Sequence, residues 1–138
     1  AAGASGTPTP AGRGEQLGLG CPALKGKLNV RSLRVPRSTG SITDLGAILS
    51  KDAGTGAINE AFRAAAGNPS FKGVLEYSDE PLVSADIVQN PASCIFSAFD
   101  TMANGKLVKV LGWYDNEWGY SNRLVDLVEF VGAATSGS

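Results

Sequence analysis

Apolar and polar positions follow strand-like and helix-like patterns only after an N-terminal stretch that shows neither. Residues 1–24 contain six Gly and three Pro, so we expect a poorly ordered segment or a short helix there. The pattern LNVRSLRV over 28–35 predicts an imperfect strand that ends at Pro36. SITDLGAILS (41–50) predicts a second strand, and the short turn between the two indicates an antiparallel pair.

Two later stretches have helical periodicity. One apolar stripe recurs with the spacing of an α-helix, at Ala57, Ile58, Ala61, Phe62 and Ala65. Thr55 is the candidate N-cap, and Gly67-Asn68-Pro69 ends the helix. A second stripe at i, i+3, i+4 and i+7 predicts a helix around 124–131, followed by a tail over 134–138.

The remaining apolar runs are short, and several of them predict strands. KGVLEY contains a short strand over 74–77, and partly apolar runs cover 83–88 and 94–99. The strongest strand is LVKVLGWY (107–114), which is rich in β-branched and aromatic residues. The order of elements predicts an α+β fold with a mixed, largely antiparallel sheet and helices packed on one face. We expect one folded domain over 25–133.

Composition narrows the class of protein. The chain has 138 residues, 43% of them hydrophobic and 18% charged, which indicates a globular domain. Its net charge of −1 argues against general binding to nucleic acid or to an anionic membrane. Since no apolar run approaches the roughly 20 residues that span a bilayer, we expect no transmembrane helix. The first residues also lack the pattern of a signal peptide.

The chain contains no histidine and two cysteines, Cys21 and Cys94. The missing histidine excludes Ser-His-Asp and Cys-His catalysis within this chain, and most zinc sites. Cys94 lies in the apolar run SCIFSAF and is interpreted as a buried small hydrophobe. Cys21 has no basic neighbour closer in sequence than Lys25. We expect reduced thiols, neither of which is a nucleophile.

Two features suggest anion binding, each with a simpler explanation. Arg34 lies near the end of a predicted strand, where a guanidinium suits phosphate or carboxylate. From spacing alone, we favour the simpler interpretation that Arg34 is a partly exposed side chain that pairs with a nearby acid. The segment 9–12 precedes a possible helix start, whose free N–H groups attract anions. Steric demands of a Gly-rich turn explain that pattern as well.

The junction between the strongest strand and the last helix gathers polar and aromatic side chains in WYDNEWGYS (113–121). Asn116 has the donor and the acceptor needed to bind a ligand amide. Asp115 is a plausible N-cap of the helix, which is the structural alternative. We therefore interpret Asp115 and Glu117 as a cap and a solvated charge, not as a catalytic carboxylate pair. The aromatic residues around Asn116 are expected to form a packed corner.

The stretch WYDNEWGYSNRLVDLV (113–128) resembles the C-terminal signature of phosphorylating glyceraldehyde-3-phosphate dehydrogenases. Other stretches resemble the same family in the same order: LKGKL (24–28), LRVP (33–36), TGSITDL (39–45), INEAFRAAAGNPSFKGVLEY (58–77), DEPLVSADIV (79–88) and PASCIF (91–96). The resemblance covers nearly the whole chain and is collinear. It implies that 25–133 is part of the family's catalytic, substrate-binding domain.

Parts of the family's pattern are absent from this chain. It contains neither a nucleotide-binding GxGxxG after a strand nor an SCTTN-like motif with the family's nucleophilic cysteine. The histidine that acts as base is absent too. No catalytic residue is therefore assigned, and the resemblance implies that this chain alone is inactive.

The resemblance assigns four binding residues. Arg34 in LRVP matches the arginine that binds substrate phosphate or inorganic phosphate, and Gly12 matches the glycine of a Thr-Gly phosphate contact. Ala11 replaces the threonine of that pair, so its hydroxyl is lost. Asn116 matches the asparagine that holds the nicotinamide carboxamide, and Tyr120 matches the tyrosine near the nicotinamide ring.

The family oxidises an aldehyde to an acyl phosphate with NAD or NADP. The resemblance thus implies NAD or NADP as cofactor, although we do not expect this chain to bind it alone. It also implies a phosphorylated aldehyde and inorganic phosphate as substrates, a homotetramer, and a location in the cytoplasm or a plastid. Two other readings stay open: a non-catalytic phosphate-binding or interaction domain, and a truncated product without function.

Overall fold

The computed structural model describes residues 7–10, 21–27, 31–35 and 39–136. The chain divides into two units, residues 1–38 and 39–138, which are described separately. In the first unit, strand β1 (Thr7–Pro10) pairs antiparallel with β2 (Arg31–Arg34). A short 3-10 helix, η1, covers Pro22–Leu24.

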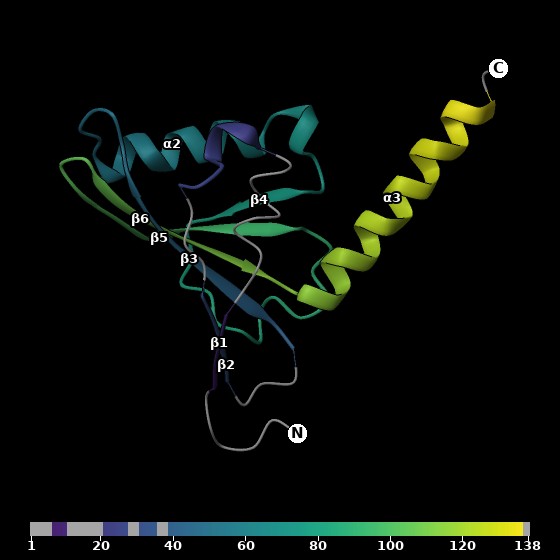
Figure 1. The fold of residues 1–138 in the computed structure, drawn as a ribbon, viewed down its shortest axis with the longest axis horizontal. Coiled ribbons are helices and arrows are strands. Elements are labelled where there is room, and N and C mark those ends of the chain that lie inside the picture. Colours follow the sequence, from purple (N-terminus) through teal and green to yellow (C-terminus); the bar gives the residue numbers. More distant parts are fainter. Residues whose placement is uncertain (1–6, 11–20, 28–30, 36–38, 137–138) are drawn as a thin grey trace. The chain divides into compact units, whose positions relative to one another are not determined.

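The second unit is built on a four-stranded sheet in the order β3-β6-β5-β4 (Figure 1). The strands are β3 (Ser41–Ile48), β4 (Leu75–Ser78), β5 (Cys94–Asn104) and β6 (Leu107–Tyr114). All neighbours are antiparallel except β4 and β5, which are parallel. The sheet is therefore mixed and largely antiparallel, and the α+β prediction is confirmed.

The predicted pairing of the first two strands is wrong. Strand β3 pairs along its whole length with β6, from Ser41 opposite Tyr114 to Ile48 opposite Leu107. Strand β2 pairs with β1 instead. The turn residues at 37–40 favour a local hairpin, but strand pairing also depends on strands distant in the sequence. Strand β6 has the same length as β3, and the two pair at all eight positions.

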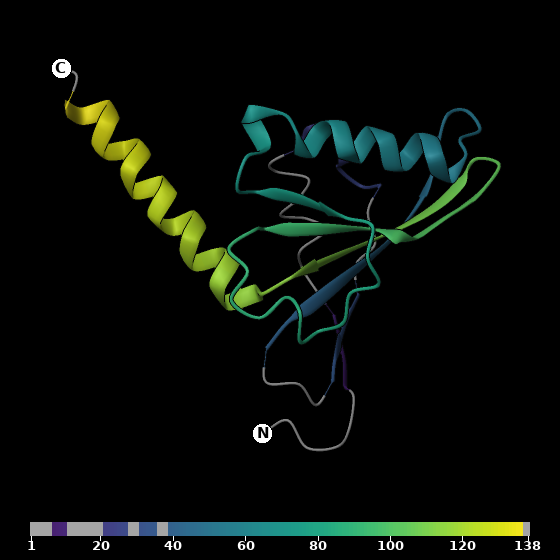
Figure 2. The same ribbon diagram turned by 180° about the vertical axis from the view of Figure 1, so that it is seen from behind.

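Helix α2 (Thr55–Ala66) lies across one face of the sheet, as both ribbon views show (Figures 1 and 2). The core beneath it consists of Ile58, Phe96, Ala98 and Val108. The helix ends as predicted, and the short 3-10 helix η2 (Pro69–Phe71) follows. The N-cap is Gly54, without a side-chain bond, so the prediction of Thr55 as N-cap is wrong by one residue. Thr55 begins the first turn instead.

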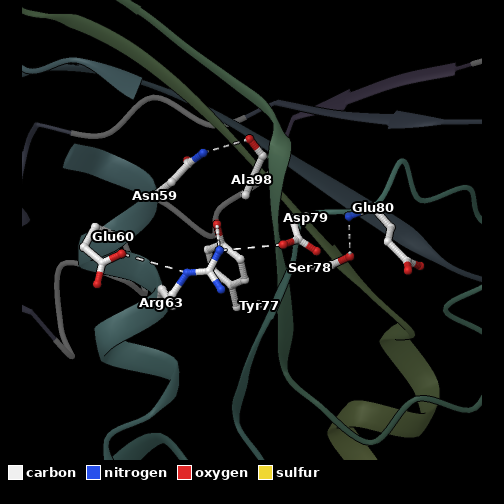
Figure 3. Close-up of polar contacts among 8 residues, drawn as sticks. All are labelled: Asn59, Glu60, Arg63, Tyr77, Ser78, Asp79, Glu80 and Ala98. Carbon is white, nitrogen blue, oxygen red and sulfur yellow. Dashed lines mark hydrogen bonds and ion pairs between the residues drawn. The ribbon is translucent and has the colours of Figure 1, made fainter. Parts of the chain in front are cut away.

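Polar contacts also hold α2 on the sheet (Figure 3). The Arg63 guanidinium lies 4.2 Å above the Tyr77 ring centroid and donates to the Tyr77 hydroxyl at 3.1 Å. It also lies 3.7 Å from the carboxylate of Asp79. Deeper in, Asn59 donates to the carbonyl of Ala98 at 3.1 Å. These contacts fix the helix against both β4 and β5.

Helix α3 (Asn116–Ser136) leaves the end of β6 and projects away from the sheet (Figures 1 and 2). Its large apolar side chains beyond the second turn are exposed, for example Phe130 at 73%. Among the described residues only α2 covers the sheet, whereas packing of both helices on one face was predicted. The helix reaches Ser136, within the predicted tail. None of the helices described has the length and apolarity to cross a membrane.

The face of the sheet opposite α2 is also apolar and open. Cross-strand pairing places four large side chains on it, and each is at least two-fifths exposed: Ile42, Ile48, Met102 and Leu107. Within this face Lys109 forms an ion pair with Asp44 at 2.9 Å. The core of this unit is therefore confined to the α2 side of the sheet and to a second cluster at the end of β6.

Candidate functional site at the β6–α3 junction

Asp115 lies between the last residue of β6 and the first residue of α3. Its side chain is 4% exposed, which is rare for a carboxylate and requires hydrogen-bond partners. Oδ1 accepts from the backbone N–H groups of Glu117 and Trp118, each at 3.1 Å. These are N–H groups that a helix start leaves unpaired, so Asp115 is the N-cap of α3, as predicted.

Two more donors reach the same carboxylate from distant segments. The Thr39 hydroxyl donates to Oδ1 at 3.1 Å, and the backbone N–H of Gln89 donates to Oδ2 at 2.9 Å. Burial raises the pKa of the Asp115 carboxyl, but the four hydrogen bonds outweigh burial, so its pKa lies below the ordinary range. Asp115 is therefore an ionised group at neutral pH.

Asn116 begins α3 and has an exposed side chain. Its Oδ1 accepts from the Ser41 hydroxyl at 3.3 Å, across the junction from β3. Among the described residues the amide nitrogen Nδ2 has no partner, so both of its N–H groups are available to a ligand. An amide held through its oxygen and free at its nitrogen suits recognition of a ligand carbonyl, which is the chemistry expected of this residue.

Tyr120 lies four residues after Asn116 and is 70% exposed. Residues at this spacing share one face of a helix, so the phenol ring and the Asn116 amide are presented together. Trp118 is also 46% exposed. The predicted packed aromatic corner is therefore wrong: α3 turns away from the sheet, and only Trp113 and Tyr114 on β6 are partly covered.

A second apolar cluster packs next to the junction, around Trp113 near the end of β6. The buried residues Ile87, Ala92 and Ile95 pack with Leu82 and Trp113. Trp113 lies on β6, and the other four residues belong to the loop between β4 and β5 and to the start of β5.

The first turns of α3 contact that loop closely. A Cβ built at Gly119 would lie 2.9 Å from the carbonyl oxygen of Ala92, so only glycine fits there. One turn later Arg123 donates to the carbonyl of Gly73, which lies between η2 and β4, at 2.5 Å. These contacts fix the direction in which α3 leaves the sheet.

The two predicted phosphate contacts fall in the first unit. Arg34 is the last residue of β2 and pairs with Thr7 in the backbone ladder, while its side chain lies outside what the structure describes. Gly12 lies outside the described residues. Both assignments remain predictions from the resemblance.

The two cysteines differ in exposure. Cys94 is half-buried at the start of β5, and burial raises the pKa of its thiol. Cys21 is exposed, and neither residue is in a disulfide. In the described part of the chain, no three acidic or cysteine side chains are grouped so that they could hold a metal ion.

The sequence did not identify Thr39, Ser41 or Gln89 as parts of the junction. All three contact Asp115 or Asn116. Ser41 and Thr39 lie 75 and 76 residues from their partners, so no local pattern links them. Gln89 has a positive φ of 63°, which is uncommon outside glycine, and the following Asn-Pro pair is the one local sign of a special turn.

Comparison with known proteins gives one consistent result. Residues 1–116 match the family model described as "Glyceraldehyde 3-phosphate dehydrogenase, C-terminal domain". The chain is 50% identical over 127 residues to glyceraldehyde-3-phosphate dehydrogenase 2 of Streptomyces arenae, covering 92% of this chain and 38% of the relative. It is 54% identical over 125 residues to the Mycobacterium avium enzyme, covering 91% and 37%.

A third relative, from Mycolicibacterium smegmatis, is 53% identical over 125 residues, covering 91% of this chain and 36% of the relative. The chain therefore spans less than two-fifths of the length of these curated relatives. The match covers most of the chain, including both β-sheets and the junction at Asp115. This chain belongs to the glyceraldehyde 3-phosphate dehydrogenase family and corresponds to its C-terminal domain.

Proposed function

We propose that this chain is the C-terminal part of an NAD- or NADP-dependent glyceraldehyde-3-phosphate dehydrogenase and binds the nicotinamide end of the cofactor. The observation that carries the proposal is the Asn116 amide, whose oxygen is held by Ser41 and whose nitrogen is free among the described residues. The amide nitrogen would donate to the carbonyl oxygen of the nicotinamide carboxamide. Tyr120, exposed on the same face of α3, would lie beside the ring.

The residues present fit one end of the cofactor only. The cofactor, when bound, accepts the hydride from the substrate. One amide and one ring give too little interaction to offset the entropy lost on association, which costs at least several kcal/mol. The chain alone is therefore proposed to bind NAD very weakly. The contacts to the rest of the dinucleotide, the nucleophile and the base would come from protein outside these 138 residues.

Arg34 would supply the phosphate contact on the substrate side. A charge-assisted bond from a guanidinium to phosphate is worth about 1.5–3 kcal/mol, or roughly a 10- to 150-fold change in affinity. Gly12 would approach phosphate through its backbone. We further propose a cytoplasmic enzyme that assembles as a homo-oligomer, as the resemblance implies.

The Asn116 assignment is tested in a fusion protein. The part of the Mycolicibacterium smegmatis relative that precedes the matched residues is joined to this chain. Because Asn116 contributes a neutral hydrogen bond of about 0.5–1.5 kcal/mol, we expect Asn116→Ala to raise KM for NAD roughly 2- to 10-fold. Asn104→Ala, a substitution at an exposed asparagine on the far end of β5, is the matched control.

The phosphate assignment is read from the same fusion. Arg34→Ala should raise KM for phosphate or for the aldehyde substrate while KM for NAD stays at the parent value. A folded Asn116→Ala protein with the parent KM for NAD would contradict the proposed cofactor contact. An Arg34→Ala protein with unchanged KM for phosphate and for aldehyde would contradict the proposed phosphate contact and leave the nicotinamide contact standing.

A further inference from the structure

The Asp115 carboxylate joins three segments that are distant in the sequence. It accepts from Thr39 in the bend just before β3, from Gln89 in the loop between β4 and β5, and from the first turn of α3. An N-cap needs only the helix N–H groups. The other two bonds therefore do something that capping does not require: they fix β3 and the loop relative to the helix start.

The segments that Asp115 fixes are the ones that hold Asn116. Ser41, which donates to the Asn116 oxygen, is the first residue of β3 and lies two residues after Thr39. Asn116 itself follows Asp115 directly and occupies the first position of the capped helix. A shift of Thr39 or of the first turn of α3 would therefore change the Ser41–Asn116 distance and the direction of the free amide nitrogen.

The loop contact also stabilises an unfavourable backbone. Gln89 has φ of 63°, a left-handed conformation that a non-glycine residue adopts at a cost. Its N–H donates to Asp115 Oδ2 at 2.9 Å. Strained backbone persists where the surroundings fix it, and here one of the fixing contacts is the Asp115 carboxylate.

A carboxylate is the side chain that this arrangement requires. Both oxygens accept, and no described lysine or arginine forms an ion pair with Asp115, so its charge is met by N–H groups and by the dipole of α3. An asparagine in its place would direct an NH2 group either at the Gln89 N–H or at the helix N–H groups. Asp115→Asn therefore removes the hydrogen bond from Gln89 or the hydrogen bonds from the helix N–H groups, while the side chain keeps its size and shape.

We propose that Asp115 is a positioning residue for cofactor binding: it fixes β3, the β4–β5 loop and the start of α3, and so orients the Asn116 amide toward the nicotinamide carboxamide. This inference rests on the proposed function, because it takes Asn116 as the cofactor contact. A residue with a purely structural role would change stability alone and would leave cofactor selectivity untouched.

The orientation of Asn116 is measured first in the 138-residue chain. In 15N-labelled protein the Asn116 side-chain NH2 resonances report its surroundings. We expect these resonances to move in Asp115→Asn and in Thr39→Val, and to stay in place in Asp52→Asn. Asp52 is exposed and has no partner among the described residues, so it controls for the lost charge. Unmoved Asn116 resonances in a folded Asp115→Asn chain would overturn the proposal.

Cofactor selectivity is measured in the fusion protein described above. The probe is NAD compared with its thionicotinamide analogue, whose sulfur is a poor acceptor for the Asn116 amide. The kcat/KM for NAD divided by the kcat/KM for the analogue should fall about 2- to 10-fold in Asn116→Ala. Asp115→Asn should lower it comparably, Thr39→Val less, and Asp52→Asn not at all. Because Asp115 acts through Asn116, the double variant Asp115→Asn/Asn116→Ala should show no further fall.

The outcomes separate the two proposals. An unchanged ratio in Asn116→Ala would refute the cofactor contact and the positioning role together. A lowered ratio in Asn116→Ala with an unchanged ratio in folded Asp115→Asn would refute the positioning role alone. If Asp115→Asn does not fold, Thr39→Val decides: a shifted ratio supports the role of Asp115, and a parent-like ratio overturns it.

Discussion

Replacing the buried Asp115 by alanine should strongly destabilise this chain. The substitution removes all four hydrogen bonds to the carboxylate. Loss of an N-cap costs about 0.5–2 kcal/mol. The bonds from Thr39 and Gln89 also end on a charge, and together with the strained loop they add about 1–2 kcal/mol. We expect the unfolding free energy to fall by about 1.5–4 kcal/mol.

The assay follows urea unfolding by tryptophan fluorescence, since Trp113 and Trp118 flank the junction on either side. In a domain of this size each kcal/mol shifts the melting temperature by about 4–8 °C, so Tm should fall by at least about 6 °C. Asp52→Ala removes an equal charge from an exposed position and should stay within about 0.5 kcal/mol of the parent. A loss below 1 kcal/mol in Asp115→Ala would refute the reasoning.

The lowered pKa of Asp115 gives this prediction a pH dependence. The carboxyl is more acidic in the folded chain than in the unfolded chain, where its pKa is about 3.9. Its contribution to stability is therefore complete above about pH 4 and is lost as pH falls through the folded-state pKa. The difference in unfolding free energy between parent and Asp115→Asn should shrink below pH 4. A difference that stays constant into this range would contradict the assignment of the charge.

Three further predictions concern the core and the thiols. Phe96→Ala should cost about 3–5 kcal/mol by urea unfolding, because the ring is 2% exposed and stacks on Phe62 at 3.9 Å; a cost under 1 kcal/mol would contradict the packing. A Cβ at Gly112 would lie 2.6 Å from the Cys94 sulfur, so Gly112→Ala should destabilise by about 1–3 kcal/mol and Cys94→Ala should relieve part of that cost; strictly additive effects would show that the two sites do not touch. Iodoacetamide should label exposed Cys21 before Cys94, whose pKa is raised by burial, as peptide mass spectrometry would show; the reverse order would refute the placement of Cys94.

Local patterns in the sequence predicted most of the secondary structure. The apolar stripe from Ala57 to Ala65 defines α2, and the β-branched run at 107–114 defines β6. Both depend on residues close together in the chain. The partner of β3 was predicted wrongly, because β6 lies about 60 residues further on and only the assembled sheet shows which strands meet.

The part of the candidate site formed by residues close together in the sequence could be predicted. Asp115 as N-cap and Asn116 as first helical residue follow from their neighbours in sequence. The rest of the site could not be predicted, since the Thr39 and Ser41 hydroxyls reach the junction only through the pairing of β3 with β6. The apolar stripe of α3 shows the same limit: periodicity predicts a helix, but it does not tell what covers that stripe.

We propose that this chain supplies one part of a dehydrogenase and cannot act alone. The direct test measures NADH formation from glyceraldehyde 3-phosphate, NAD and phosphate, using the 138-residue chain and the fusion side by side. We predict no turnover by the chain above a blank without protein, and turnover by the fusion that thiol alkylation abolishes. Turnover by the chain alone, or a folded fusion without activity, would contradict the account.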